Sequence, residues 1–279
     1  MSQPKFKLRK VLKALTRRGP LRVVKRLWIA MLAIGPKIRL AVRWSFSKTE
    51  DSNFYYQLEP QSELNLAHSL ATTFGVSRSQ VQLYFSELKT NINLMDAQTA
   101  LRKADFSMRH SSLEPGRRLA WYAVARILKP KVILETGVHQ GVGAFALCMA
   151  LEQNYVETGI LGKYFGTDLR ADAGALVRSS KIDRFFNLLV GDSIDSIENL
   201  DAEIDLYVSD SDHLEGYERK ELLIVESKLS PESVVISDNS HSTSVLSDWS
   251  EQVGREFTFF RGTAFQSLVS RCGCRHFPV

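Results

Sequence analysis

Acidic side chains close five apolar runs in the second half of this 279-residue chain. The runs end at Glu135, Asp168, Asp192, Asp210 and Asp238. Carboxylates gathered at one edge of a sheet repel each other unless they share a cation or a ligand rich in hydrogen-bond donors. The pattern therefore predicts one binding site that draws on several strand ends.

The first run leads into a glycine-rich turn, ETGVHQGVG. Its order, G-x-x-x-G-x-G, differs from the dinucleotide fingerprint G-x-G-x-x-G, and no Gly-Lys-Ser/Thr follows to make a P-loop. Glu135 would repel a pyrophosphate but suits a cofactor with a cationic end. S-adenosylmethionine (SAM) carries an ammonium and a sulfonium, and its ribose hydroxyls suit a carboxylate from the next strand end, which is Asp168.

The elements that position these residues are apolar runs that alternate with helical patterns. Val, Ile and Leu dominate the runs, which indicates a mostly parallel sheet covered by helices on both faces. Ligands of such sheets bind beyond the carboxyl ends of the strands. The expected fold is α/β, a Rossmann-like, doubly wound seven-stranded sheet preceded by an N-terminal helical extension. The expected strands are 131–137, 164–169, 186–192, 204–210 and 233–238, with a closing hairpin of 256–262 and 264–271.

The glycine turn resembles motif I, E/D-x-G-x-x-x-G, of class I SAM-dependent methyltransferases, and the resemblance covers residues 115–270 in order. It implies that residues 137–139 line the methionine moiety and that Asp168 binds the ribose hydroxyls. Asp192 and Ser193 would flank the adenine. The predicted cofactor-binding set is Glu135, Gly137, Val138, His139, Gly141, Gly143, Asp168, Asp192, Ser193 and Asp210.

Two later segments, DLYVSDSDHLEGY and VVISDNSH, resemble the metal site of catechol O-methyltransferase and its relatives, including bacterial sugar and natural-product O-methyltransferases. The resemblance implies that Asp210, Asp238 and Asn239 bind Mg²⁺, an ion that prefers oxygen ligands. The catechol enzyme places a lysine base three residues after its first metal aspartate, and His213 stands there in this chain. A histidine can take a proton near neutral pH. His213 and Asp210 are therefore the predicted catalytic residues.

Several residues near the predicted site have simpler explanations. Asp238 and Asn239 also favour turns, and His213 could be a structural histidine at a helix start. Glu215 and Glu218 are expected on a solvated helix face. His139 and His241 are expected only to line the site. Four basic residues either contact an anionic substrate or lie on helix surfaces, namely Arg109, His110, Arg117 and Arg118.

The charge of the chain is strongly asymmetric. Residues 1–49 carry 14 Lys and Arg and no acid, whereas the remaining 230 residues carry 22 basic and 31 acidic side chains. The arm pattern predicts short helices with breaks at Gly19-Pro20 and Gly35-Pro36, and its apolar run LWIAMLAIG is too short to span a bilayer. Attachment to an anionic membrane surface and packing on the acidic domain or a partner subunit both stay open. Nucleic acid is less favoured, since the arm lacks a recognisable motif.

The chain divides into three predicted parts: the basic amphipathic arm 1–49, a helical cap or substrate region 50–114, and a SAM-binding domain 115–279. Helices are expected at 62–75 and 77–92, the latter capped by Ser77 or Ser79. Three cysteines form no disulfide framework, which indicates a cytoplasmic protein, with the arm allowing peripheral membrane association. A homo-oligomer formed through the helical middle stays open.

The combined pattern predicts a SAM-dependent O-methyltransferase, Mg²⁺-assisted, that acts on a hydroxyl of a small molecule, a sugar or a lipid-linked acceptor. Two alternatives remain on the sequence alone. The first is an RNA-modifying methyltransferase that uses the basic arm for phosphate contacts. The second is a non-catalytic SAM-binding interaction protein. Fold by itself does not decide among them.

Overall fold

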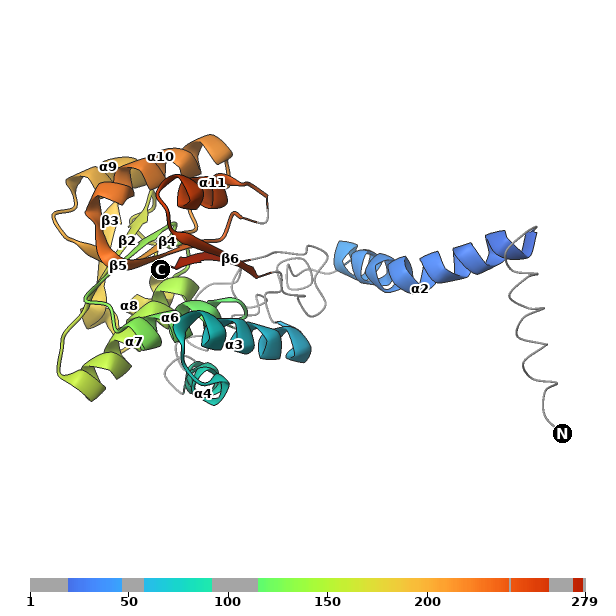
Figure 1. Ribbon diagram of the computed structural model, residues 1–279, viewed down its shortest axis with the longest axis horizontal. Coiled ribbons are helices and arrows are strands. Elements are labelled where there is room, and N and C mark those ends of the chain that lie inside the picture. The colour runs from blue at the N-terminus through green and yellow to red at the C-terminus, as the bar shows by residue number, and fades with distance from the viewer. Residues whose placement is uncertain (1–19, 47–57, 92–114, 241, 261–272, 278–279) are drawn as a thin grey trace. The chain divides into compact units, whose positions relative to one another are not determined.

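The computed structural model describes residues 20–46, 58–91, 115–240, 242–260 and 273–277 (Figure 1). The chain forms two compact units. One contains helix α2 (Pro20–Ser45), and the other contains every other described helix and strand. The helical region that was predicted as a separate cap thus shares a unit with the sheet. Its boundaries at 50 and 114 lie outside the described residues.

Helix α2 is continuous over 26 residues, with Pro36 in its interior. The predicted break at Gly35-Pro36 is therefore wrong. A proline removes one backbone hydrogen bond from a helix, but Ala, Leu and Met, which are strong helix formers, dominate the turn before it and keep the helix intact. The helix begins at Pro20, where the missing N–H costs nothing. Within the described part of the chain, no helix is long and apolar enough to cross a membrane.

The second unit is built on a seven-stranded sheet of order β3-β2-β1-β4-β5-β7-β6. The first five strands pair in parallel, and β7 runs antiparallel to β5 and β6. This arrangement confirms the expected fold class. The strands are β1 (Val132–Thr136), β2 (Lys163–Asp168), β3 (Phe186–Val190), β4 (Ile204–Ser209), β5 (Leu229–Ser237), β6 (Glu256–Phe260) and β7 (Gly273–Phe277).

The closing hairpin differs from the prediction in its second strand. Strand β6 begins at Glu256 as expected, but it pairs with β7, and residues 264–271 lie outside the described part of the chain. The sequence of β7, GCRHF, contains no apolar run, which is why it was not recognised as a strand. Backbone hydrogen bonds to β5 on one side and β6 on the other hold it in the sheet.

Helices cover both faces of the sheet (Figure 1). Side chains alternate along a strand, so Ile133 of β1 enters the core under α6 and α7, and Leu134 enters the core under α10 and α11. On the first face lie α3 (Pro60–Phe74), α4 (Arg78–Lys89), α6 (Arg118–Leu128), α7 (Val142–Thr158) and α8 (Ala175–Arg178). On the second lie α9 (Ser193–Asn199), α10 (Glu215–Val225) and α11 (Val245–Gln252), and two short 3₁₀ helices are Asp183–Phe185 and Glu226–Lys228.

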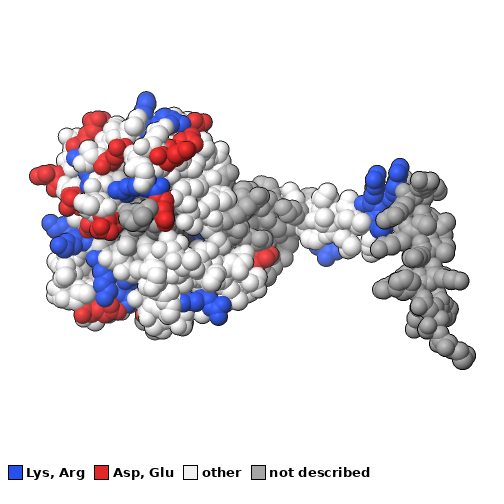
Figure 2. All heavy atoms as spheres, in the orientation of Figure 1, with Lys and Arg blue, Asp and Glu red and all other residues white. Residues whose placement is uncertain are grey.

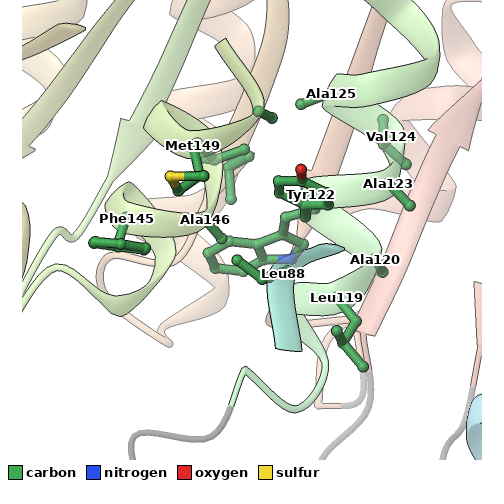
Figure 3. Close-up of a cluster of buried hydrophobic side chains, with 14 of the residues drawn as sticks. Leu88, Leu119, Ala120, Tyr122, Ala123, Val124, Ala125, Phe145, Ala146 and Met149 are labelled. Carbon is green, nitrogen blue, oxygen red and sulfur yellow. The ribbon is translucent and has the colours of Figure 1, made fainter. Parts of the chain in front are cut away.

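The predicted helices before the sheet are both present. The hydroxyl of Ser77 caps α4 by accepting a hydrogen bond from the Gln80 amide at 3.1 Å. Leu88 of α4, Tyr122 of α6 and Met149 of α7 belong to one buried cluster (Figure 3). The hydrophobic core under the sheet therefore continues outward into α4, which fixes α6 at the edge of the predicted site.

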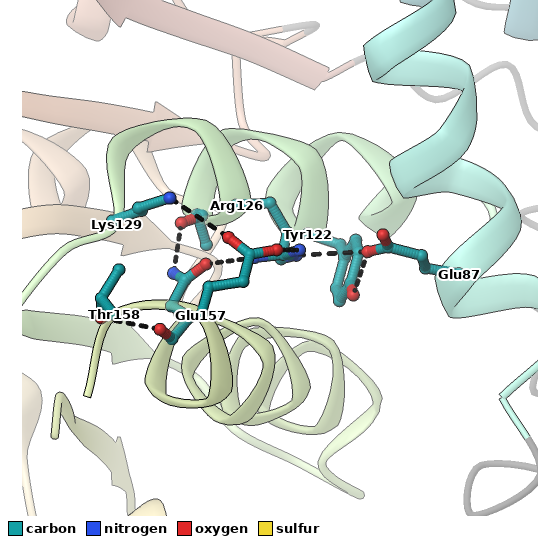
Figure 4. Close-up of polar contacts among 8 residues, drawn as sticks. Glu87, Tyr122, Arg126, Lys129, Glu157 and Thr158 are labelled. Atoms are coloured by element: carbon teal, nitrogen blue, oxygen red, sulfur yellow. Dashed lines mark hydrogen bonds and ion pairs between the residues drawn. The ribbon is translucent and has the colours of Figure 1, made fainter. Parts of the chain in front are cut away.

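A buried arginine ties these three helices together (Figure 4). Arg126 of α6 is 2% exposed and donates to Glu87 of α4 at 3.2 Å and to Asn154 of α7 at 2.5 Å. It also forms an ion pair with Glu157 of α7. The Tyr122 hydroxyl donates to the same Glu87 carboxylate at 2.9 Å. Each polar group that folding buries here has a partner, as burial requires.

Replacing Arg126 with alanine is expected to lower the free energy of unfolding by about 2–3 kcal/mol, because it leaves the buried Asn154 Oδ1 without its donor and removes one of the two donors to Glu87. Urea denaturation followed by circular dichroism measures this change. Lys129→Ala is the matched control, since Lys129 pairs with the same Glu157 at 3.1 Å but is 44% exposed. Its effect should stay under about 0.5 kcal/mol. Equal effects of the two variants would contradict the structural role of Arg126.

Candidate functional site

The register of the sheet brings the predicted residues into one row. Thr136 of β1 pairs with Thr167 of β2 and with Ser209 of β4, and Ser209 pairs with Ser237 of β5. The carboxyl ends of these four strands are therefore level. The next residue along each strand is Gly137, Asp168, Asp210 and Asp238.

A cavity of about 730 Å³ opens at this end of the sheet. It is large enough for a cofactor-sized ligand. The predicted residues that line it are Gly137, Val138, His139, Gly141, Asp168, Asp192, Ser193, Asp210 and His213. The predicted residues that do not line it are Glu135, Gly143, Asp238 and Asn239. The wall also includes Arg117 and Arg118, which were considered as contacts of an anionic substrate, and Arg170 and Tyr217, which were not considered.

Asp168 links the ends of β1 and β2. Its Oδ2 accepts a hydrogen bond from the His139 amide at 2.7 Å, and its Oδ1 accepts one from the Arg170 amide at 2.9 Å. His139 has a positive φ of 48°, in the left-handed region that residues other than glycine rarely adopt. Burial, followed by the charge of Arg170, lowers the pKa of His139. Since a carboxylate has about four lone-pair sites, Asp168 can still accept from ribose hydroxyls.

The end of β3 is held by a hydrogen-bond network that reaches α10. Asp192 caps α9 by accepting from the Ile194 amide at 2.9 Å, and it accepts from the Tyr217 hydroxyl at 3.1 Å. The Ser193 hydroxyl donates to Glu221 at 2.5 Å. Glu221 is buried, and burial raises its pKa. Tyr217 and Glu221 were missed, although their spacing of four residues on a helix places them on one face.

Glu135 and Gly143 lie beneath the glycine turn and do not reach the cavity wall. Glu135 is 1% exposed and accepts a hydrogen bond from the Tyr164 hydroxyl at 2.6 Å. A Cβ at Gly143 would stand 2.4 Å from Glu135 Oε1, so only glycine lets α7 start directly above this carboxylate. The two residues therefore shape the turn. Burial raises the pKa of Glu135 to about 7.

Replacing Glu135 with glutamine is expected to change how stability depends on pH. Between the ordinary pKa of 4.5 and the folded value of about 7, the folded state binds more protons than the unfolded state, so wild-type stability falls as pH rises. Glutamine does not titrate and can still accept from Tyr164. The variant should exceed the wild type by about 2–3 kcal/mol at pH 8 and match it near pH 4.5.

Chemical denaturation across this pH range tests the expectation. Glu232→Gln is the control, because Glu232 is an exposed glutamate of β5 and its loss should leave the pH profile unchanged. Parallel profiles for Glu135→Gln and the wild type would show that Glu135 keeps an ordinary pKa in the folded protein.

Two arginines at the start of α6 meet the acidic pair at the other side of the cavity. The Arg117 guanidinium forms an ion pair with Asp238 and lies 4.0 Å from Asp210 Oδ1. Arg118 lies 3.7 Å from Asp210 Oδ2. Of the two alternatives for these arginines, the helix surface does not fit Arg117, which is 8% exposed. Burial, then the charge of Asp238, raises the pKa of Asp210 well above its usual range, and the two arginines oppose that shift.

His213 is oriented by the residue that follows Asp238. Its Nδ1 is hydrogen-bonded to Asn239 Oδ1. Asn239 Nδ2 donates to the Asp212 carbonyl at 3.3 Å, which fixes the orientation of the amide. An amide oxygen only accepts, so Nδ1 carries a proton, and in the neutral imidazole Nε2 is then the nitrogen with the lone pair. His213 lines the cavity with one ring nitrogen able to take a proton.

Other side chains contact the predicted Mg²⁺ ligands in this arrangement. Arg117 is paired with Asp238 and lies beside Asp210, and the amide oxygen of Asn239 is occupied by His213. Among the described residues, no group of three or more His, Cys, Asp or Glu side chains lies close enough to hold a metal ion. A divalent cation would have to displace Arg117. Three other residues considered from the sequence lie outside the described ranges, namely Arg109, His110 and His241.

Glu218 is fully buried, so its expected place on a solvated helix face is wrong. It accepts from Ser237 at 2.5 Å and from Thr243 at 2.7 Å, and so holds the segment after β5. Residues 218, 222 and 225 form the buried face of α10, and hydroxyl donors supply the partners that a buried carboxylate needs. Glu215 is exposed, as expected.

Comparisons with known proteins agree with this geometry. Residues 134–240 match a family model described as "Methyltransferase domain". Similar solved structures include the O-methyltransferase TomG of Streptomyces achromogenes in complex with SAM, at 20% identity and a TM-score of 0.50, covering 71% of this chain and 94% of that one. An O-methyltransferase of Bacillus cereus in complex with SAH has 12% identity and a TM-score of 0.52, covering 68% and 91%.

A third similar structure is a putative caffeoyl-CoA O-methyltransferase of Staphylococcus aureus, at 12% identity and a TM-score of 0.50, covering 73% of this chain and 100% of that one. At these identities the likeness shows the fold. A comparison with curated protein sequences finds no match.

Proposed function

We propose that this chain is a class I, SAM-dependent methyltransferase that transfers the methyl group of SAM to a hydroxyl oxygen. The observation that carries the proposal is the cavity at the carboxyl ends of β1 to β4. It brings a glycine turn, three strand-end carboxylates and an oriented histidine to a single space.

The cofactor half of the proposal rests on the ends of β1, β2 and β3. Asp168 holds the turn residue His139 and retains lone pairs for two ribose hydroxyls. Asp192 and Ser193, held by α10, would flank the adenine. The turn residues 137–139 would receive the methionine end. This assignment uses six of the predicted residues that line the cavity.

The acceptor half rests on His213. Methyl transfer is an in-line displacement at the sulfonium carbon, and a hydroxyl is a weak nucleophile until it loses its proton. The Asn239 contact places the proton of the neutral imidazole on Nδ1, so Nε2 of that form can take the hydroxyl proton while the oxygen attacks the methyl carbon. The leaving group is the neutral thioether of S-adenosylhomocysteine (SAH).

The test is transfer of tritiated methyl from SAM to a panel of hydroxylated acceptors, beginning with sugars, phenols and lipid-linked sugars. His213→Ala is expected to lower the rate by about 100-fold while the affinity for SAH stays within twofold of wild type. His68→Ala is the control, because His68 of α3 does not line the cavity and its loss should change neither value. A wild-type protein that binds no SAH would refute the enzyme assignment, and the interaction-protein alternative would then be favoured.

The nature of the acceptor and the need for Mg²⁺ belong to this proposal as well. A small molecule, a sugar or a lipid-linked sugar each fits a hydroxyl-directed site. Magnesium would supply charge stabilisation of the acceptor oxygen if it bound Asp210, Asp238 and Asn239. The contacts of Arg117 and His213 with those residues argue against such binding.

We also propose that the basic arm attaches the enzyme to anionic membrane surfaces, which would bring lipid-linked acceptors within reach. Helix α2 contains no acidic residue. It combines basic side chains with exposed apolar ones (Figure 2). Such a helix can insert its apolar side chains among lipid headgroups while Lys and Arg pair with anionic lipids. The exposed apolar residues are Val23, Val24, Leu27, Trp28, Ile29, Met31, Leu32, Ile34, Ile38 and Val42.

Sedimentation with lipid vesicles tests the attachment. The full chain is expected to sediment with vesicles of phosphatidylcholine and phosphatidylserine and to stay in solution with pure phosphatidylcholine. Changing Lys25 and Arg26 to glutamine should weaken vesicle binding by roughly 30-fold, at about 1 kcal/mol for each basic residue. The control is a paired change of Lys220 and Arg219 to glutamine on α10. Equal loss in both double variants would refute the assignment to the arm.

A further inference from the structure

Arg117 stands at the position that the sequence pattern assigns to a metal ion. We propose that its guanidinium is the built-in cation of the acceptor site, so that the chain neutralises Asp210 and Asp238 and orients its acceptor without a divalent metal. The inference rests on the proposed function for the existence of an acceptor at this place. It concerns only which cation neutralises Asp210 and Asp238 and contacts the acceptor.

The contacts of Arg117 carry the argument. Its guanidinium pairs with Asp238, which is 1% exposed, and lies 4.0 Å from Asp210 Oδ1. Two carboxylates at neighbouring strand ends, both withdrawn from water, need a positive charge beside them. A guanidinium is planar, keeps its charge at all physiological pH values and offers five donors. It can therefore bridge two carboxylates as a metal ion would.

The fold fixes Arg117 at this place. It lies directly before α6, whose residues 119–125 are all buried under the sheet. Arg118 follows it and adds a second positive charge 3.7 Å from Asp210 Oδ2. Two arginines thus face two aspartates, and this balance leaves little electrostatic attraction for a further divalent cation.

Arg117 also lines the cavity, together with Asp210 and His213. An acceptor oxygen that gives its proton to His213 gains negative charge as it attacks. A cation beside that oxygen stabilises the charge and fixes its direction. Arg117 is thereby a positioning residue that does for the acceptor what a resident metal would do.

Titration calorimetry with Mn²⁺ in the presence of SAH tests the inference, because Mn²⁺ is an oxygen-binding probe for the same ligand set. The wild type is expected to show no Mn²⁺ binding that depends on Asp238. Arg117→Ala should gain a Mn²⁺ site at least about 100-fold tighter than any binding that the wild type shows, because the variant loses the positive charge next to both carboxylates. Adding Asp238→Asn to that variant should remove the new site.

Arg118→Ala is the matched control. It removes an arginine from the same cluster but leaves the Arg117–Asp238 pair in place, so it should gain no comparable Mn²⁺ site. Arg117→Gln gives a second variant of similar size if the alanine change prevents folding. With an active acceptor, wild-type methyl transfer should continue in EDTA, and Arg117→Ala should become responsive to added Mn²⁺.

Wild-type Mn²⁺ binding that disappears in Asp238→Asn would overturn the inference, whatever the arginine variants do. So would Arg117 variants that fold, bind SAH and gain no Mn²⁺ site. The SAH control keeps the two proposals apart. Loss of SAH binding in the wild type refutes the proposed function, whereas the metal results in an SAH-binding protein decide only the role of Arg117.

Discussion

Asp168→Ala is expected to weaken SAM binding by at least about 100-fold, because two hydrogen bonds from ribose hydroxyls to a carboxylate are lost, each worth about 1.5–3 kcal/mol. A second effect acts in the same direction. The carboxylate also holds the amides of His139 and Arg170 at 2.7 and 2.9 Å, so its removal frees the turn that would receive the methionine end. Titration calorimetry with SAM measures the loss.

Two further variants separate these effects. Asp168→Asn keeps one acceptor oxygen and should lose less affinity than the alanine variant. Asp172→Ala is the matched control, since Asp172 lies in the same loop and pairs with Arg170, but is exposed and does not line the cavity. It should bind SAM within about twofold of wild type. An Asp168→Ala protein that binds SAM normally would show that the cofactor ribose does not lie at the end of β2.

The parallel sheet could be predicted from the sequence because its central strands β1, β4 and β5 are buried on both faces. Apolar runs such as 132–136 and 204–209 need no knowledge of the rest of the fold to be recognised. The position of the acidic residues could be predicted for the same reason, because each apolar run stops where the chain leaves the core. Strand β7 has no such run, and Pro36 suggested a break within α2 that the helix formers around it override.

The site was only partly predictable, for reasons that depend on distance along the chain. Asp168 and the glycine turn each follow directly after an apolar run, so a short stretch of sequence is enough to recognise them as binding residues. Arg117 and Asp238 lie 121 positions apart, and their ion pair exists only because α6 packs under the sheet with its first residue at the strand ends. The charge of Glu218 suggested a place in solvent, but Glu218 lies on the same face of α10 as the buried Leu222 and Val225.

Gly137→Ala is expected to lower the free energy of unfolding by about 3–5 kcal/mol and to abolish SAM binding. Gly137 has a φ of +83°, and a Cβ there would stand 2.2 Å from the Asp210 carbonyl oxygen and 2.8 Å from Ser211 Cα. Both neighbours are backbone atoms, so neither can rotate away. The turn would have to separate from the end of β4, which moves the cofactor side of the cavity away from Asp210.

Gly75→Ala separates backbone strain from this contact. Gly75 has a φ of +64° at the end of α3, but a Cβ there would meet nothing within 4 Å. Its cost should be about 1 kcal/mol, which is the penalty of the left-handed backbone alone. Urea denaturation of both variants, with SAH titrated into each, gives the comparison. If the two variants lost equal stability and both still bound SAH, the close contact between the glycine turn and β4 would not exist. The cofactor side and the acceptor side of the cavity would then not be held together by the contact between Gly137 and the end of β4.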